Sequence, residues 1–200
     1  MRKAMKNAIG SFEETAANAV FYSCKHIQTV KKTMPATPED LFARLESLSI
    51  RVKTYHHPPL FTVEDSQKLR GDIPGAHCKN LFLKDKKGAL WLIVTLEDTP
   101  VNLKTLHKRI GAAHLSFAKP ELLMQVLGVT PGSVSPFALI NDTKAQVNVI
   151  LDSHMMDGEI LNYHPLTNEM TSTITNRDLL KFIRACGFEP AHLEVAAEDH

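Results

Sequence analysis

Apolar residues recur at the spacing of amphipathic helices in several segments of the 200-residue chain. The first segment opens with the signals of a helix start, Thr37 as the N-cap residue and Pro38 in the first turn. The later segments end at a glycine, and the last also has Thr175 and Asp178 placed for a capping box. We therefore predict helices over 38–48, 62–71, 102–111, 119–128 and 175–187.

Alternating or continuously apolar runs between these segments predict strands. The clearest pair is 80–85 and 89–96, which a lysine-rich turn joins into a hairpin, and the second strand is apolar enough to be central in its sheet. Further strands are expected over 52–61, 134–142, 146–152 and 159–165. Because several strands adjoin through tight turns and alternate irregularly with helices, we predict an α/β fold of the α+β type with a mixed, mainly antiparallel sheet.

Composition and charge are those of one ordinary globular domain. Hydrophobic residues make up 44% of the chain and charged residues 22%, which suits a single core. Lysine and arginine number 23 against 22 acidic residues, so the net charge of +1 gives no overall attraction to nucleic acid. The three widely spaced cysteines form no CxxC pair, which argues against a disulfide framework and favours a reducing, cytoplasmic location. No apolar run reaches the roughly 18 residues that cross a membrane.

The first 33 residues differ from the rest of the chain. They are basic at both ends and only weakly amphipathic, and the sequence from Met34 onward looks like a second beginning. We predict that 1–33 is an extension, either non-native or disordered, and that one domain spans 34–200. The alternative is an ordinary N-terminal helix docked on that domain.

The common catalytic and cofactor motifs are missing from the sequence. Ten histidines invite a metal site, but no HExxH occurs, and the adjacent His56 and His57 would point to opposite faces of a strand. The same alternation separates Cys78 from Lys79, which weakens the case for an activated cysteine nucleophile. There is also no GxSxG elbow, Walker loop or GxGxxG element. We therefore expect neither a metal nor a cofactor.

Two local features remain as candidate chemistry. Lys79 opens a strand that is about to be buried, and a buried ammonium needs either an anionic partner or a route to solvent. Within 127–139, Gly132 and Pro136 belong to a stiff, tightly turned loop that can aim several backbone amides at one point. The alternative for this loop is an ordinary helix-to-strand connector.

Four stretches in this order, "HPPLFTVEDS", "HCKNLFL", "GSVSP" and "NYHPLTNEMTSTI", closely resemble motifs of the YbaK/ProX-type aminoacyl-tRNA editing domains. The likeness extends from about Met34 to the last predicted helix and is greatest to the free-standing alanyl-tRNA(Pro) deacylases. It implies a mixed, partly barrel-like sheet surrounded by short helices. It also implies an ester hydrolase that removes alanine mischarged on proline tRNA and so protects translation fidelity.

The resemblance gives roles to particular residues. Lys79 would face the cleft where the tRNA 3′ end enters and bind its phosphate or ester region. Gly132 and its neighbours would bring backbone amides to the scissile carbonyl, while water attacks with help from the terminal ribose hydroxyl. The other residues expected to contact the substrate in this cleft are Asn80, Ser133, Pro136 and His164. For His164, a capping or core hydrogen bond is the alternative role.

Selectivity for alanine over proline requires a small pocket, because an apolar site can exclude a larger side chain only by clash. Leu60 and Phe61 are the expected wall of that pocket. Positive charge for the tRNA acceptor stem is available on the predicted hairpin and on the helix after it, from Lys84, Lys86, Lys87, Lys104, Lys108 and Arg109. A solvated surface is the alternative role of these cations.

Two other functions stay open at the level of the sequence. One is a cysteinyl-tRNA(Pro) deacylase of the same fold, which would differ in pocket volume. The other is a non-catalytic module that binds tRNA or a synthetase, which the lack of an obvious nucleophile would permit. The expected partner is alanine-charged proline tRNA, with prolyl-tRNA synthetase or an elongation factor in transient complexes and no membrane.

Overall fold

A computed structural model describes residues 34–59 and 73–196 of the chain. These residues belong to the unit Met34–His200. The predicted extension over 1–33 and the predicted helix over 62–71 lie outside the described residues. No helix in the described ranges is long and apolar enough to cross a membrane.

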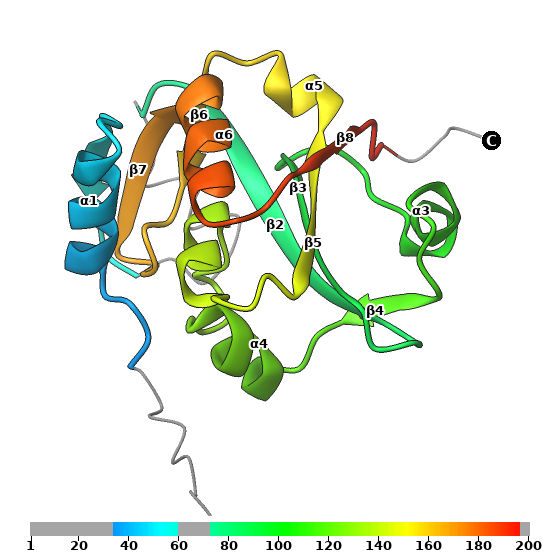
Figure 1. Cartoon of the computed structure of the whole chain (residues 1–200). Coiled ribbons are helices and arrows are strands. Elements are labelled where there is room, and N and C mark those ends of the chain that lie inside the picture. Colours follow the sequence, from blue (N-terminus) through cyan, green and yellow to red (C-terminus); the bar gives the residue numbers. More distant parts are fainter. Residues whose placement is uncertain (1–33, 60–72, 197–200) are drawn as a thin grey trace, which may run out of the picture. The chain divides into compact units, whose positions relative to one another are not determined.

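Short helices alternate with short strands along the chain, as Figure 1 shows. The helices are α1 (Pro38–Ser47), α3 (Leu103–Arg109), α4 (Pro120–Leu127), α5 (Ser153–Met156) and α6 (Asn176–Ala185), together with a 3₁₀ helix, η1 (Pro136–Asn141). The strands are β1 (Lys53–His56), β2 (Ala76–Asp85), β3 (Leu90–Leu96), β4 (Leu115–Phe117), β5 (Val147–Asp152), β6 (Ile160–Tyr163), β7 (Met170–Thr175) and β8 (Ala191–Leu193).

The helix signals in the sequence act as predicted, and α1, α3, α4 and α6 are confirmed. At the start of α1 the Thr37 hydroxyl and the Asp40 carboxylate each accept the other residue's backbone N–H, which completes a capping box. Gly128 ends α4 in the left-handed conformation, with φ of +65°. Built there, a Cβ would lie 2.7 Å from the Pro35 side chain, so this position requires glycine for space as well as conformation.

The strands form an eight-stranded sheet in the order β1-β7-β6-β2-β3-β5-β8, with β4 paired to β2. Among the pairings of described strands, four are antiparallel (β1–β7, β2–β3, β2–β4 and β6–β7) and three are parallel. The mixed, mainly antiparallel sheet and the β2–β3 hairpin are therefore confirmed. β2 is the strand that links the two halves of the sheet, because it pairs with β6 at its start and with β3 along the rest of its length.

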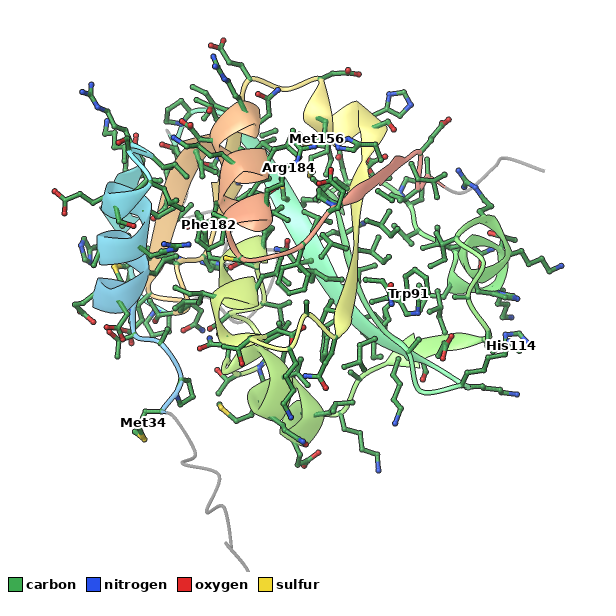
Figure 2. All side chains as sticks on the ribbon, in the orientation of Figure 1. Met34, Trp91, His114, Met156, Phe182 and Arg184 are labelled. Carbon is green, nitrogen blue, oxygen red and sulfur yellow. The ribbon has the colours of Figure 1, made fainter. Side chains whose placement is uncertain are left out.

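Apolar side chains cover both faces of this sheet. The larger core lies toward α1, α4, η1 and α6, where the buried rings of Phe137 and Phe182 meet edge to face with their centroids 5.5 Å apart. Figure 2 labels Phe182 on α6. The smaller core joins Leu83 and Ile93 to Leu106 of α3. Figure 1 accordingly has α3 on the opposite side of β3 and β5 from α6. The two faces of β2 thus look toward different cores.

The predicted strand over 134–142 is wrong, because the chain forms η1 there. Pro136 has no N–H to give to a strand ladder, and its fixed φ suits the first turn of a helix. Phe137, Ala138 and Leu139 are all buried in the larger core. The continuous apolar run therefore reflects burial on every side, which periodicity alone does not distinguish from a buried strand.

Candidate active site

Among the strands of the described residues, one edge of β2 is paired at its two ends and not between them. β6 runs parallel to β2 only at the first two residues of β2, and β4 pairs with its last three. Next to β4, the N–H of Ala118 donates to the Phe82 carbonyl at 3.0 Å. Because alternate residues of a strand direct their backbone polar groups to the same side, the N–H and C=O of Asn80 point to this open edge. We call this stretch around Asn80, between β6 and β4, the β2 gap.

Asn80 and Lys79 reach the β2 gap from opposite faces of the sheet. Asn80 shares its face with Phe82 of the larger core, and its side-chain Oδ1 is buried without a hydrogen bond in the described part of the chain. Lys79 shares its face with Leu81, which packs on the smaller core. A buried acceptor without a donor is rare in folded proteins, so Asn80 has the capacity to bind a donor group of a ligand.

The ammonium of Lys79 is half-buried and donates to the backbone carbonyl of Thr99. Burial lowers the pKa of Lys79, while the nearby carboxylates of Asp98 and Glu97 act in the opposite direction. The predicted requirement for a partner is therefore met here by a carbonyl and two acidic neighbours. Lys79 is also the fourth residue of β2 and not its first, since the strand begins at Ala76.

The loop before η1 contains backbone amides without a hydrogen-bond acceptor in the described ranges. Gly132 has φ of +92°, in the left-handed region that favours glycine. The N–H of Ser133 is taken, because it donates to the Thr130 carbonyl at 3.0 Å within the turn. The N–H groups of Gly132, Val134 and Ser135 make no hydrogen bond to the residues that the structure describes. Of the predicted loop donors, Ser133 is thus committed to the turn, while its neighbours keep a donor for a ligand.

This loop is fastened to the end of β6. The buried Ser135 hydroxyl donates to the backbone carbonyl of His164 at 2.7 Å, and His164 directly follows the last residue of β6. Pro136 and Ser133 are also buried, so they define the position of the loop more than they offer side-chain contacts. The structure therefore places the loop and His164 together, as the resemblance implies. Ser135 is a site residue that the sequence analysis did not identify.

The His164 ring is oriented by hydrogen bonding. Its Nδ1 lies 2.8 Å from the carbonyl of Met170, and because a carbonyl only accepts, Nδ1 carries the proton and Nε2 is the acceptor nitrogen of the neutral ring. The ring of His57 lies 6.0 Å away, edge to face. His57 is itself held, since Nδ1 donates to the Pro58 carbonyl and Nε2 accepts from the Thr171 hydroxyl, each at 2.9 Å. The sequence analysis did not assign His57 to the site, although the first family-like motif begins with it.

The predicted tRNA-binding cations fall into two groups in the structure. Lys84, Lys86 and Lys87 are exposed at the β2–β3 turn, and Lys104 and Lys108 are exposed on α3. Arg109 is different, because its guanidinium donates to the backbone carbonyls of Ala196 and Glu194 and so holds the segment after β8 against α3. The contacts of Arg109 within the fold explain its position, whereas the five exposed lysines keep their ammonium groups in solvent.

Other candidate chemistry finds no support in the described residues. Burial raises the pKa of the Cys78 thiol to about 11, so this cysteine is protonated and a poor nucleophile near neutral pH. No group of His, Cys, Asp and Glu side chains arranged to hold a metal occurs within 34–59 and 73–196. A hollow beside β5, lined by Trp91 and Phe188 among others, contains none of the predicted site residues. The predicted pocket wall, Leu60 and Phe61, lies outside the described residues.

Comparison with protein families gives a match to a model described as an aminoacyl-tRNA editing domain, over residues 57–182. Among similar proteins, prolyl-tRNA editing protein ProX of Acetoanaerobium sticklandii is 36% identical over 148 residues, which are 74% of this chain and 90% of that protein. Prolyl-tRNA synthetase associated domain-containing protein 1 of Mus musculus is 37% identical over 156 residues, 76% of this chain and 92% of that protein.

Solved structures share the fold. The crystal structure of a candidate trans-editing enzyme for prolyl-tRNA synthetase superposes with a TM-score of 0.61 at 19% identity, covering 78% of this chain and 96% of that one. The crystal structure of the hypothetical protein APE2540 gives a TM-score of 0.61 at 17% identity, with 76% and 97% covered. At these identities the likeness shows the fold alone.

Proposed function

The chain belongs to the aminoacyl-tRNA editing domain family, and from this membership we propose that it is a trans-acting hydrolase that deacylates alanine mischarged on proline tRNA. The names of its relatives, which refer to prolyl-tRNA editing and to prolyl-tRNA synthetase, support the choice of tRNA. The observation that carries the chemistry is the loop around Gly132, which has unused N–H groups and is fastened through Ser135 to His164 beside the β2 gap. Such an arrangement suits an acyl-transfer reaction.

In the proposed reaction, water adds to the ester carbonyl that joins alanine to the terminal ribose. The carbonyl oxygen becomes negatively charged, and the N–H groups of Gly132 and Val134 stabilise that charge. The bond between the carbonyl carbon and the ribose oxygen then breaks, the ribose oxygen takes a proton, and alanine and uncharged tRNA leave. No covalent intermediate with the protein is required, which agrees with a Cys78 thiol that stays protonated.

The remaining residues orient the substrate. The buried, unpaired Oδ1 of Asn80 would accept a hydrogen bond from the α-ammonium of the aminoacyl group. Lys79 would exchange the Thr99 carbonyl for a phosphate of the incoming 3′ end, because a charge-assisted bond to an anion is stronger than a bond to a neutral carbonyl. His164, whose Nδ1 donates to the Met170 carbonyl, would help to orient the substrate from the end of β6.

Specificity for alanine belongs to the same proposal. A pocket that fits a methyl group excludes proline by size but cannot strongly reject other small side chains. Leu60 and Phe61 remain our proposed pocket wall. We propose that the enzyme acts in the cytoplasm, where mischarged tRNA arises. It would contact prolyl-tRNA synthetase or an elongation factor transiently.

The test is a deacylation panel with alanine, cysteine, serine and proline each attached to proline tRNA. We expect rapid release of alanine, slower release of serine and no release of proline. Preferential release of cysteine would show that the substrate is cysteinyl-tRNA(Pro), while the chain would still be a deacylase. Tight binding of tRNA without release of any amino acid would overturn the hydrolase proposal in favour of a binding module.

A further inference from the structure

An exposed aromatic ring lies on the edge strand beside the β2 gap. Phe117, the last residue of β4, has 66% of its surface exposed, an unusual position for a phenylalanine in a domain with two apolar cores. It is not part of either core, whereas Leu115 packs against the smaller core and Ala118 against the larger one. The exposure of Phe117 is therefore not explained by folding.

Phe117 and Lys79 point to the same face of the sheet. Phe117 is directly opposite Leu83 in the β2–β4 pairing, and Leu83 and Lys79 are four residues apart on β2. Because side chains alternate along a strand, residues an even number apart share a face. At about 3.3 Å per residue, the positions of Lys79 and Leu83 are separated by roughly 13 Å.

The surroundings of Phe117 are basic. Lys119 follows it by two residues in extended backbone and is exposed, whereas the exposed Lys84, paired with Ser116 next to it, points to the opposite face of the sheet. His114, at the start of this edge segment (Figure 2), stacks on the ring of His107 with centroids 4.6 Å apart. One acidic residue, Glu121 in the first turn of α4, is close in sequence. Positive charge around an exposed ring is the pattern that binds single-stranded nucleic acid, with phosphates on the cations and a base on the ring.

We propose that Phe117 is a stacking platform for a base of the unpaired 3′ end of the tRNA. This inference rests on the proposed function, which brings the terminal ribose to the β2 gap. A stacked strand rises about 3.4 Å per nucleotide, so roughly 13 Å correspond to about four nucleotides, and fewer when the strand is stretched. The ring is thus placed for a base upstream of the terminal adenosine, within the unpaired discriminator and CCA nucleotides. The spacing along β2 therefore sets the distance between Lys79, which would bind a phosphate of the 3′ end, and the stacking platform.

Substitutions separate stacking from general hydrophobic contact. Phe117→Ala should weaken the binding of full-length proline tRNA by roughly 5- to 150-fold, the range for loss of one base–aromatic stack. Phe117→Trp should restore binding, because a π-face is all that is needed, whereas Phe117→Leu should not. Met124→Ala is the matched control, since Met124 is another exposed large apolar side chain, on α4, with 42% of its surface exposed. Thermal melts of all four variants should stay close to that of the wild-type protein.

One small substrate and one truncated tRNA ligand separate a failure of this inference from a failure of the proposed function. Alanyl-adenosine carries the ester but no upstream nucleotides, so Phe117→Ala should hydrolyse it at the wild-type rate. A proline tRNA lacking its unpaired 3′ nucleotides should bind the wild-type protein and Phe117→Ala equally. The platform would be overturned if the wild-type protein and Phe117→Ala bound intact tRNA equally, or if Phe117→Leu bound it as tightly as the wild-type protein. It would also be overturned if Phe117→Ala lost binding to prolyl-tRNA synthetase and not to tRNA. Wild-type protein that cleaves neither alanyl-adenosine nor alanyl-tRNA(Pro) would instead overturn the hydrolase proposal.

Discussion

Substitution of Gly132 by valine tests the central feature of the proposed mechanism. With φ of +92°, residue 132 has a conformation that β-branched residues rarely adopt. Holding valine there costs about 1–3 kcal/mol, which for a domain of this size lowers Tm by roughly 2–12 °C. The protein should therefore remain folded at assay temperature. The valine would also displace the amides from the scissile carbonyl, and loss of one oxyanion donor alone reduces turnover by about 100- to 1,000-fold.

Gly187 provides the matched control for backbone strain. Its φ of +91° is nearly identical, a Cβ added there meets no atom within 4 Å, and it lies after α6 in a turn that carries none of the proposed site residues. Gly187→Val should therefore lose about the same stability as Gly132→Val while keeping its activity. The difference between the two variants isolates the contribution of the loop to catalysis.

The assay is single-turnover hydrolysis of alanyl-tRNA(Pro), with denaturant titrations of both variants and a binding titration of uncharged tRNA at fixed salt. Binding by Gly132→Val should change only a few-fold, because the lysines proposed to bind phosphate are outside this loop. Hydrolysis by Gly132→Val within about threefold of Gly187→Val would refute the oxyanion role, since the expected loss is at least about 100-fold. The loop would then be only a connector between α4 and η1.

Three further predictions concern single side chains. Lys79→Ala should reduce the rate of deacylation by about 100-fold or more, measured by single-turnover hydrolysis. It should change the free energy of unfolding by no more than about 1 kcal/mol, measured by urea titration, because Lys79 donates a hydrogen bond to one backbone carbonyl in the folded protein. Ser135→Ala should lower the free energy of unfolding by about 0.5–1.5 kcal/mol and also slow turnover, because the His164 carbonyl keeps the Leu166 N–H as a donor but loses the hydroxyl that ties the loop to β6. Stability loss without a catalytic defect would contradict the coupling of the loop to β6. Cys78 should resist alkylation at pH 8 until the protein unfolds, because a pKa of about 11 keeps the thiol of the folded state protonated there. The free energy of unfolding should then decline as pH rises from about 9 to 11, because the thiol of the unfolded state ionises first. Rapid labelling of native Cys78 would contradict the raised pKa.

Local signals in the sequence were sufficient to predict α1, α3, α4, α6 and the β2–β3 hairpin, whereas the single-turn helix α5 was not predicted. Thr37 with Asp40, Gly128 and the turn between β2 and β3 each act through neighbours a few residues away, so their effect can be read without a structure. The error at η1 has the opposite cause. Its apolar run is buried from all directions by distant segments, and only Pro136 within it favoured a helical turn over a strand.

The candidate site was predictable in its parts more than in its assembly. The motifs identified Gly132, Lys79 and His164, and strand alternation alone could have placed Lys79 and Asn80 on opposite faces. The bond from Ser135 to His164 could not be predicted, because it joins residues 29 positions apart through packing of a loop on a strand end. The register of β6 on β2, which leaves the gap open, likewise depends on tertiary contacts.

The pairing of β1 with β7 has a consequence for biosynthesis. Lys53 and Thr173 are register partners 120 residues apart, and Arg44 of α1 donates to the Ala185 carbonyl at the end of α6. At about 5–20 residues per second on the ribosome, α1 and β1 would wait roughly 6–24 s for the elements that cover them. During that interval the apolar stripe of α1 lacks β7 and α6, which belong to the same core. The nascent chain should therefore depend on chaperones, and the site should form only when synthesis is nearly complete.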